Sequence, residues 1–470
     1  MARIRRRSRL ATGALSLAVV FAGGGVTVGG MIAANAATEP VESRAAEPAA
    51  APGPVGTARP TVETPAEFDD DEGGNADADA PAIWINPDKA QASLVIGTLK
   101  DAGLSVFDLA GKQVQRIAAP PAPGPDDVAG RLNNVDILYG VRTGKGRQDI
   151  AVVSDRGRDQ LRIFRIDAKA ATAGKPALTD ITDPAAPFVF SADQAEVNTQ
   201  NTAYGVAAFL DDDEPLVLVT REHTTRLGLV RLVAKGGRMG YEVVRTADLP
   251  ARFTLPDGST FTPCEDPGEA PQSEGMVVDV EEGVVYVGQE DVGLWKMAAT
   301  LQPFRPELVD KAREFGVPAT FDPVEEECVV SGPDPGFGGE HLSADVEGLT
   351  IYHRGDDDGY LIASSQGDST FAVYELGDDN AFIGSFQVGD SASGIDGVQE
   401  TDSLTVTNVP LGKFRHGLAV FADGANTPEV AGPDGEARDN TNFKLVPWES
   451  VANSFDPPLE IDTDGFDPRD

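Results

Sequence analysis

The stretch LVIGTLKDAGLSVFDL, Leu94–Leu109, consists of a short apolar strand, a polar loop and a strand of alternating polarity. The same unit returns at five later places, with starts 56 to 76 residues apart: Ile150–Ile166, Leu216–Leu232, Val284–Met297, Tyr360–Leu376 and, more loosely, Leu418–Trp448. Each unit has room for two further strands. Six such hairpins predict an all-β fold, a six-bladed β-propeller. A pair of β-sandwiches is the alternative that this pattern leaves open.

A second stretch, SADVEGLTIY at Ser343–Tyr352, indicates the chemistry. Asp345 and Glu347 stand two residues apart at the start of an apolar strand, so their side chains project to the same side. Carboxylates fixed at a strand edge, with Gly348 beside them, suit a hard cation that prefers oxygen ligands, such as Ca²⁺. Further carboxylates in similar settings recur along the chain, so cation binding is the leading hypothesis.

The composition limits the possible partners. The 470 residues are enough for one large or two ordinary domains with a sizeable core. They include 38 Lys and Arg against 76 Asp and Glu, which gives a net charge of −38. Such a surface repels nucleic acid and anionic membranes, so neither is expected as a partner. An anionic substrate would be repelled as well, unless bound cations reverse the field locally.

The N-terminus predicts export. A basic head with five arginines between Arg3 and Arg9 precedes an apolar middle, Leu10–Val28, and a small-residue cleavage site, Ala34–Ala36. This order is typical of a secretion signal, here residues 1–36, and a membrane anchor is the alternative. The pair Arg6-Arg7 leaves the twin-arginine route open beside the general one. We therefore expect a secreted, extracellular protein.

The rest of the chain divides into a linker and a domain. Residues 37–66 are rich in Ala, Pro, Glu and Thr and are expected to form a disordered linker, followed by a propeller domain over residues 67–470. Two cysteines, Cys264 and Cys328, lie in insertions rich in Pro, Gly and Glu. In an exported chain a disulfide between them is favoured over free thiols, and it would staple loops without taking part in chemistry.

The loops of the hairpin units differ in charge. Equivalent loops of a propeller open on one face around its axis, so one half of that face would be basic and the other acidic. A site that grips a phosphate with Lys or Arg and a metal with carboxylates needs this division. The residues are Lys100, Arg156, Arg158, Arg221 and Arg226 in the first three loops, and Glu290, Asp291, Gln366 and Asp368 in the next two. For any single loop, an ordinary solvated hairpin tip is the alternative.

Seven motifs together carry a resemblance to a known family. They are DADAPAIW (77–84), LNNVD (132–136), SEGM (273–276), QED (289–291), DVEGLT (345–350), ASSQG (363–367) and NFKLVPW (442–448), in this order over nearly the whole chain after residue 67. In these motifs the chain resembles the β-propeller phytases, secreted calcium-dependent enzymes that release phosphate from myo-inositol hexakisphosphate. The resemblance implies a phosphoric monoester hydrolase of the 3-phytase type, with several bound Ca²⁺ ions.

The resemblance implies three groups of functional residues. Phosphate is expected to be bound by Lys100, Arg156, Tyr204 and Arg221. Catalytic calcium is expected to be held by Glu274, Glu290, Asp345 and Glu347, with Asp79 beside them. The turn at 133–136 is expected to bind calcium, through Asn134 and Asp136, or to contact the substrate. A structural calcium site is expected from Asp396 and Asp402, with Asn440 as a companion.

The expected reaction makes physical sense for these residue types. Hydrolysis of a phosphate monoester requires neutralised charge on three oxygens and a water in line. Clustered calcium ions would bridge the phosphate and polarise that water. Calcium lowers the pKa of water less than zinc does, so a carboxylate is expected to assist as general base. Asp79 or Glu274 is assigned this role, and Glu347 completes the catalytic set.

The chain also departs from the family pattern. Ala80 stands where relatives have a second Asp, which weakens or removes one calcium site. Asp101 stands where relatives have a second Lys beside Lys100, which lessens the positive charge near a second phosphate. The insertions around 254–272 and 298–342 are longer than in the shorter bacterial relatives. These changes bear on affinity more than on reaction type.

Other functions have less support. Arg415-His416-Gly417 is similar to the motif of histidine acid phosphatases, but an apolar strand follows where that chemistry needs a further Arg and Pro, so covalent histidine catalysis is rejected. Four His and two Cys in loops make zinc sites equally poor, and no Gly-x-Ser-x-Gly elbow is present. A catalytically inactive calcium-binding propeller and a calcium propeller lactonase stay open as alternatives. A monomer is expected.

Overall fold

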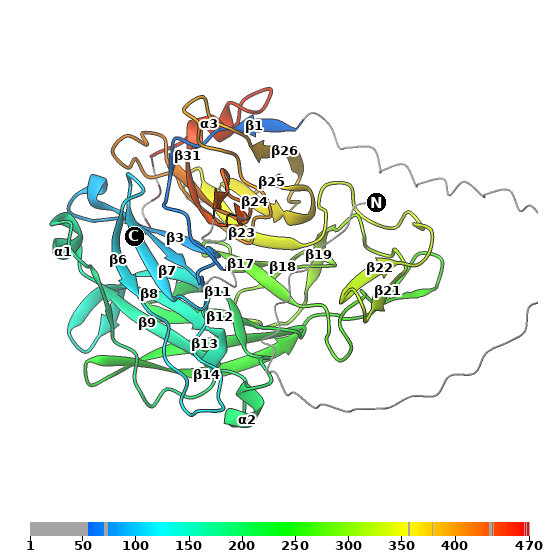
Figure 1. Ribbon diagram of the computed structural model, residues 1–470, viewed down its shortest axis with the longest axis horizontal. Coiled ribbons are helices and arrows are strands. Elements are labelled where there is room, and N and C mark those ends of the chain that lie inside the picture. Colours follow the sequence, from blue (N-terminus) through cyan, green and yellow to red (C-terminus); the bar gives the residue numbers. More distant parts are fainter. Residues whose placement is uncertain are drawn as a thin grey trace, which may run out of the picture. The chain divides into compact units, whose positions relative to one another are not determined.

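The computed structural model describes residues 55–69, 74–355, 358–377, 379–431, 435, 437–464, 466, 468 and 469. The predicted secretion signal and residues 37–54 of the predicted linker lie outside the described residues. The described residues form six sheets of four or five strands, which are the blades of a β-propeller (Figure 1). The predicted fold is therefore confirmed.

The first three blades follow one another along the chain. The first contains β3 (Pro81–Trp84), β4 (Leu94–Thr98), β5 (Leu104–Asp108) and β6 (Gln113–Ile117). The second contains β7 (Leu132–Thr143), β8 (Gly146–Asp155), β9 (Gln160–Ile166) and β10 (Leu178–Asp180). The third contains β11 (Ala203–Asp211), β12 (Glu214–Arg221), β13 (Arg226–Lys235) and β14 (Arg238–Asp248).

The other three blades include strands from the start of the domain. The fourth contains β17 (Ser273–Asp279), β18 (Val284–Gln289), β19 (Gly293–Ala298) and β20 (Glu307–Lys311). The fifth contains β23 (Val346–His353), β24 (Gly359–Ser365), β25 (Thr370–Glu375), β26 (Phe382–Val388) and β1 (Gly56–Ala58). The sixth contains β27 (Leu404–Thr407), β28 (Leu418–Asp423), β31 (Asn442–Pro447) and β2 (Val62–Glu63).

The first strands of the blades form a closed ring. Strand β3 contacts β7, and the contacts continue through β11, β17, β23 and β27 back to β3. In Figure 1 the labelled first strands lie toward the middle of the domain. Each hairpin predicted from the sequence corresponds to the second and third strands of one blade, because these strands carry the apolar and alternating patterns that the sequence displays.

Two short strands before residue 67 form the outer edges of the fifth and sixth blades. Strand β2 pairs with β31 antiparallel, Val62 opposite Leu445, and strand β1 pairs with β26 in parallel. Both strands lie in the segment for which the composition predicts a disordered linker, so the structure differs from that expectation here. The physical reason is that their partners lie at the far end of the chain, and three or fewer residues per strand leave no pattern in the local sequence.

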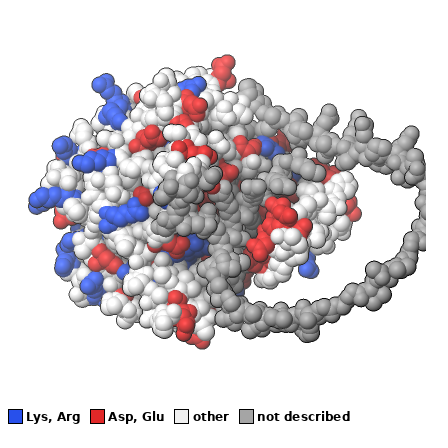
Figure 2. All heavy atoms as spheres, in the orientation of Figure 1, with Lys and Arg blue, Asp and Glu red and all other residues white. Residues whose placement is uncertain are grey.

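The core lies between neighbouring blades. Trp84, Phe107 and Phe443 belong to one buried apolar cluster that joins the first, second and sixth blades. Aliphatic side chains of the second and third strands fill most of the remaining space, because strands buried on both faces need apolar residues on both. In the view of Figure 2, Lys and Arg gather on the left, over β6, β8, β9 and α1 (Ala168–Thr172).

Short helices, 3-10 turns and two-stranded sheets lie outside the six blade sheets. The helices are α1, α2 (Gln194–Val197) and α3 (Trp448–Ala452), and the 3-10 turns are η1 (Ala90–Ala92), η2 (Arg156–Arg158) and η3 (Gln366–Asp368). Two-stranded sheets pair β15 (Phe253–Thr254) with β16 (Thr260–Phe261), β21 (Ala319–Asp322) with β22 (Glu327–Val330), and β29 (Val430–Ala431) with β30 (Ala437–Arg438). Among the described residues, no helix has the length and apolarity needed to cross a membrane.

The insertions around the fourth blade are joined covalently. Cys264, before β17, forms a disulfide with Cys328 on β22, with a Cα–Cα distance of 6.0 Å. The predicted disulfide is therefore confirmed. Behind it, Phe253, Phe261 and Phe315 pack edge to face, so the insertions have a small aromatic core of their own against the fourth blade.

Candidate active site

One end of the ring collects carboxylates from two blades. Neighbouring strands of a blade are antiparallel, so the start of a first strand lies beside the end of the second strand. Ser273 thus pairs with Gln289, and Val346 pairs with Ser365. As a result Glu274 on β17, Glu290 just after β18 and Glu347 on β23 come together, and carboxylate oxygens from the three lie within 4.8 Å of one another.

These three residues, which we call the glutamate triad, are buried. Their exposed fractions are 3% for Glu274, 3% for Glu290 and 4% for Glu347. Burial raises the pKa of Glu347 well above its usual value, and the negative charges of Glu290 and Glu274 raise it further. Burial also raises the pKa of Glu274. Like charges held this close and out of water are unfavourable unless a cation neutralises them.

Bulges in the first strands aim the site residues. The pairing of the first strand with the second shifts register between Leu132 and Val135, between Ala203 and Val206, between Ser273 and Met276, and between Val346 and Leu349. Asn133, Tyr204, Glu274 and Glu347 all lie in these irregular steps. A bulge leaves one residue out of the ladder and turns its side chain. The four neighbouring blades therefore present polar side chains toward one region.

Glycines let these strands approach closely. A Cβ atom at Gly275 would lie 2.1 Å from the carbonyl oxygen of Glu347, and one at Gly205 would lie 1.9 Å from that of Glu274. Real Cβ atoms cannot come so near to a backbone oxygen, so only glycine fits between adjacent blades here. The Glu-Gly and Tyr-Gly pairs of the sequence are thus part of the site's geometry.

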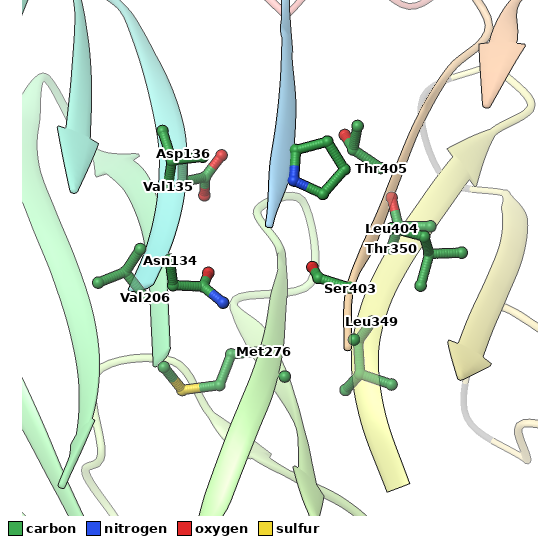
Figure 3. Close-up of a pocket in the computed structure, with 13 residues that line it drawn as sticks. Asn134, Val135, Asp136, Val206, Met276, Leu349, Thr350, Ser403, Leu404 and Thr405 are labelled. Atoms are coloured by element: carbon green, nitrogen blue, oxygen red, sulfur yellow. The ribbon is translucent and has the colours of Figure 1, made fainter. Parts of the chain in front are cut away.

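The triad lies beside a narrow channel between the first strands of the six blades. A small cavity of about 50 Å³ is lined by residues of all six first strands or the residues next to them. Figure 3 shows Asn134 and Asp136 of β7 on one side and Ser403 and Thr405 on the other. Asn134 Nδ2 donates to Glu274 Oε1 at 3.4 Å, so the channel and the triad meet at this residue.

Lys100 lies among carboxylates of the first and sixth blades. Its Nζ is 2.9 Å from Asp77 Oδ2, 3.1 Å from Asp402 Oδ2 and 3.8 Å from Asp79 Oδ2. Burial alone would lower the pKa of Lys100, but Asp402, Asp77 and Asp79 outweigh it and hold that pKa well above its usual value. The ammonium therefore stays charged at neutral pH.

Asp79 connects Lys100 with the triad. It is 1% exposed, and neither of its oxygens has a hydrogen-bond partner among the described residues. Burial raises the pKa of Asp79 well above its usual value; Lys100 opposes this shift, and the charge of Glu274 adds to it. Asp345, which is also buried, lies close enough to add its charge at Glu347.

Arg156 is the second cation of the site. Its Nη1 donates to Asn133 Oδ1 at 3.1 Å, and Asn133 Nδ2 in turn donates to Glu274 Oε1 at 2.6 Å. Its Nη2 forms an ion pair with Glu222, and its guanidinium carbon lies 5.1 Å from the centre of the Tyr204 ring. A hydrogen-bonded chain thus joins Arg156 to the triad through Asn133.

The oxygen-rich donor set fits a hard divalent cation. The triad, Asp345 and Asp79 offer only carboxylate oxygens, which such cations prefer, and no sulfur or imidazole nitrogen. Glu347 Oε2 is buried without a hydrogen-bond partner in the described part of the chain, as a ligand oxygen would be before an ion binds.

The structure does not bring every expected residue to this cluster. Arg221 pairs with Glu196 at 2.8 Å and donates to the carbonyl of Asn201 at 2.7 Å, and its guanidinium carbon lies 5.8 Å from the centre of the Phe190 ring. Asp136 accepts from the backbone N–H groups of Ile137 and Ala208, which use both of its oxygens. Sequence motifs predict that these residues lie near the end of the ring that holds the triad, but they do not show in which direction each side chain points.

Asp396 and Asp402 do not share one site. Asp402 binds Lys100 and accepts from Gln366 Nε2 at 2.7 Å. Asp396 binds the buried ammonium of Lys444 and the hydroxyl of Thr427. The two aspartates thus belong to different networks, Asp402 to that of Lys100 and Asp396 to that of Lys444.

Several residues of the site were missed by the sequence reasoning. Asp77, Arg131, Glu222 and Gln272 all contact residues expected to function. Asn133 was expected only as part of the turn at 133–136, and it contacts Glu274. Asp77 and Asn133 lie inside quoted motifs, so their position was a usable signal. Glu222 and Gln272 had none, because the contact of Glu222 with Arg156 joins two blades, and Gln272 meets Glu290 only when β17 and β18 pair.

The comparisons with known proteins agree with this geometry. A family model described as Phytase matches residues 32–204 and 329–470. The chain is 30% identical over 392 residues to the 3-phytase of Bacillus subtilis (strain 168), which covers 82% of this chain and 83% of that protein. The chain belongs to the phytase family. This phytase is a phosphoric monoester hydrolase with a small-molecule substrate, from a family that depends on metal ions.

Solved structures share less with this phytase. A protein of unknown function from Bacteroides thetaiotaomicron VPI-5482 gives a TM-score of 0.38 at 12% identity, over 83% of this chain and 75% of that one. The β-propeller domain of Cps50 (Swd1) from Myceliophteria thermophila gives 0.36 at 9% identity, over 78% and 82%. Similarity at this level carries no argument about function.

Proposed function

We propose that this phytase is a secreted, calcium-dependent enzyme that hydrolyses the phosphate monoesters of myo-inositol hexakisphosphate by attack of a metal-activated water. The observation that supports this most is the glutamate triad, three buried carboxylates within 4.8 Å of one another at the end of the channel. Buried charge of one sign, with oxygen donors only, is what a site for a hard cation requires. An acidic protein that binds calcium there becomes attractive to a polyanion.

Glu274, Glu290, Glu347 and Asp345 would hold the catalytic calcium. When bound there, calcium would neutralise charge on the phosphate oxygens and make water more acidic. The chain's own residues supply the rest. Lys100 and Arg156, each anchored by carboxylates, present fixed positive charge to the phosphate.

We assign the general base to Asp79 rather than Glu274. In the described part of the chain both oxygens of Asp79 are without hydrogen-bond partners, whereas Glu274 Oε1 already accepts from Asn133 and Asn134. A carboxylate whose pKa is raised by burial takes up a proton more readily than an exposed one, which suits the removal of a proton from water. Tyr204, stacked beneath Arg156, would orient the substrate.

The other residues that were expected to bind phosphate or calcium are assigned more limited roles. Arg221 is left out of the phosphate grip, because its contacts are with Glu196 and Asn201, whereas those of Arg156 lead through Asn133 to the triad. Asp402 belongs with Lys100 at the catalytic mouth. Asp396 and Asn440 stay assigned to a structural calcium site, where an ion would have to displace or sit beside the ammonium of Lys444. Asn134 and Asp136 are assigned to the channel.

The same proposal covers the setting of the enzyme. A disulfide fits an oxidising, extracellular location, and the basic and apolar N-terminal segment fits a secretion signal ahead of a linker and one propeller domain. The strong net negative charge of −38 argues against nucleic acid and anionic membranes as partners. We propose a monomer.

Release of phosphate from phytate at millimolar calcium, with and without a chelator, tests the proposal. Activity should require calcium, return when the chelator is saturated, and be lost in Glu347→Ala. A protein that binds calcium but frees no phosphate would be the inactive binding module. Activity on a lactone instead of phytate would indicate the lactonase. Full activity in the presence of the chelator would refute the role of calcium.

A further inference from the structure

Glu314 joins one of the insertions to the segment that carries Asp345. It lies in the loop that follows β20, and both of its carboxylate oxygens accept hydrogen bonds. Ser343 Oγ donates to Glu314 Oε1 at 2.8 Å, and Ala344 N donates to Glu314 Oε2 at 2.9 Å. These two donors belong to the residues directly before Asp345. Glu314 therefore holds the chain at the point where this expected calcium ligand begins.

The backbone on both sides of Glu314 is itself fixed. Arg313 N donates to the carbonyl of Leu342 at 2.8 Å, so the loop after β20 runs beside the segment that leads to β23. Phe315 is 4% exposed and packs into the aromatic core of the insertions. The carboxylate of Glu314 is thus presented by a packed stretch of backbone.

Asp345 is also held from its other side. Val346 N donates to the carbonyl of Glu290 at 2.9 Å, and Gln366 N donates to the carbonyl of Asp345 at 3.0 Å. Together with the two bonds to Glu314, these contacts fix the backbone before, at and after Asp345. Ligands that are already held in place bind an ion more tightly, because the cost of ordering them does not reduce the binding free energy.

The bond from Ala344 is the more important of the two. Ala344 is 2% exposed, so removal of the Glu314 carboxylate would leave a buried N–H group without its acceptor, which is costly. The segment would have to shift to find another partner, and Asp345 would shift with it. Both oxygens of Glu314 are used by these donors, so Glu314 acts through the backbone and not as an ion ligand.

We propose that Glu314 is a positioning residue for the calcium site, which through Ser343 and Ala344 keeps the carboxylates of Asp345 and Glu347 in the arrangement that an ion requires. The proposal rests on the function proposed above. Residues that orient metal ligands commonly contribute about ten- to hundredfold to metal affinity. The insertion would thereby take part in calcium binding without supplying a ligand.

The test compares four variants with the wild-type enzyme. Glu314→Ala removes both acceptor oxygens, and Glu314→Gln keeps one of them. Ser343→Ala removes one donor and leaves the charge of Glu314 in place. Glu325→Ala is the matched control, because it removes the same charge from an exposed turn of the same insertion, between β21 and β22 (Figure 1).

The first readout is the dissociation constant of the calcium ion whose binding is lost in Glu347→Ala, measured by isothermal titration calorimetry on the metal-free protein. Glu314→Ala should raise this constant about ten- to hundredfold. Glu314→Gln and Ser343→Ala should raise it about three- to tenfold, as expected for one lost hydrogen bond. Glu325→Ala should match the wild type. An unchanged constant in Ser343→Ala beside a rise in both Glu314 variants would mean an effect of charge alone and would overturn the proposal.

The second readout is phosphate release from phytate as a function of calcium concentration. In Glu314→Ala the calcium concentration for half-maximal activity should rise by the same factor as the dissociation constant, and kcat at saturating calcium should return to that of the wild type. A role in folding alone would lower the activity at every calcium concentration and leave the calcium affinity unchanged. That result would also overturn the proposal.

The outcomes separate this proposal from the one on calcium. A wild-type enzyme that binds no calcium at the triad would refute the proposed function, and the role of Glu314 with it. A wild type that binds calcium, with equal affinity in Glu314→Ala, would overturn the role of Glu314 only. Melting curves in a chelator show whether Glu314→Ala folds. If it does not, Glu314→Gln and Ser343→Ala decide the question, since unchanged calcium affinity in both contradicts the proposal.

Discussion

Replacement of Glu347 by Gln removes one buried charge of the triad and keeps the side-chain shape. The triad oxygens lie within 4.8 Å, and two full charges at about that separation repel by about 3 kcal/mol at an effective dielectric constant of about 20. Glu347 faces two such partners. Its pKa is raised well above the usual value by burial and by the charges of Glu290 and Glu274.

Whether Glu347→Gln raises or lowers the free energy of unfolding should depend on bound calcium. With a chelator, Glu347→Gln should raise the free energy of unfolding by about 2 to 4 kcal/mol, because one repelling charge is gone. With calcium, the variant has lost a ligand, and each tenfold loss of affinity removes about 1.4 kcal/mol of stabilisation by the bound ion. The variant should therefore be more stable than the wild type in the chelator and gain less from calcium.

Thermal and denaturant unfolding followed by circular dichroism, each with chelator and with millimolar calcium, measures both effects. Glu242→Gln, the same change at an exposed position of β14, is the control and should leave both conditions unchanged. Phosphate release from phytate should be lost in the triad variant only. A triad variant that is less stable than the wild type in the chelator, or gains as much from calcium, would refute the electrostatic account.

The remaining predictions concern packing, pH and the disulfide. Gly275→Ala would place a Cβ atom 2.1 Å from the carbonyl of Glu347, so it should lower the free energy of urea unfolding by about 3 kcal/mol and abolish activity; an active variant of normal stability would contradict the close approach. Burial raises the pKa of Asp155 to about 7. A folded value above the unfolded one means that its contribution to stability is complete below the unfolded pKa and lost as pH rises through 7. Asp155→Asn should therefore flatten the fall in stability between about pH 4 and 7 in denaturant titrations, and an unchanged slope would show that other groups titrate. The double change Cys264→Ser and Cys328→Ser removes a disulfide between residues 64 apart in the sequence, and it should lower the free energy of unfolding by at most about 4 kcal/mol. Phosphate release at 25 °C should persist. Its loss in a folded variant would mean that the disulfide shapes the site.

A large part of the fold could be predicted from local sequence patterns. The pattern of an apolar strand, a polar loop and an alternating strand is set by neighbouring residues, so the six hairpins were visible without any tertiary information. Strands β1 and β2 were not visible, because a strand of two or three residues gains its identity from a partner such as β31. Their pairing appears only when the ring closes.

The candidate site, too, could be predicted only in part from the sequence. Motifs around Glu274, Glu290 and Glu347 were found from the sequence, and the structure places these three together. Arg221 was assigned to the phosphate grip from its loop and from the resemblance, and its ion pair with Glu196 could not be foreseen, since rotamer and partner depend on packing against α2.

By itself, the sequence determined which segments pair locally, how strongly acidic the surface is, and which side chains can act as oxygen ligands or phosphate partners. Only the tertiary structure decided which of these meet. Bulges and glycine contacts between first strands aim Glu274 and Glu347 at one point, and the ring brings Lys100 next to Asp402 of another blade. The physical reason is that a charge's neighbours in space fix its energy, and here those neighbours come from loops far apart in the chain.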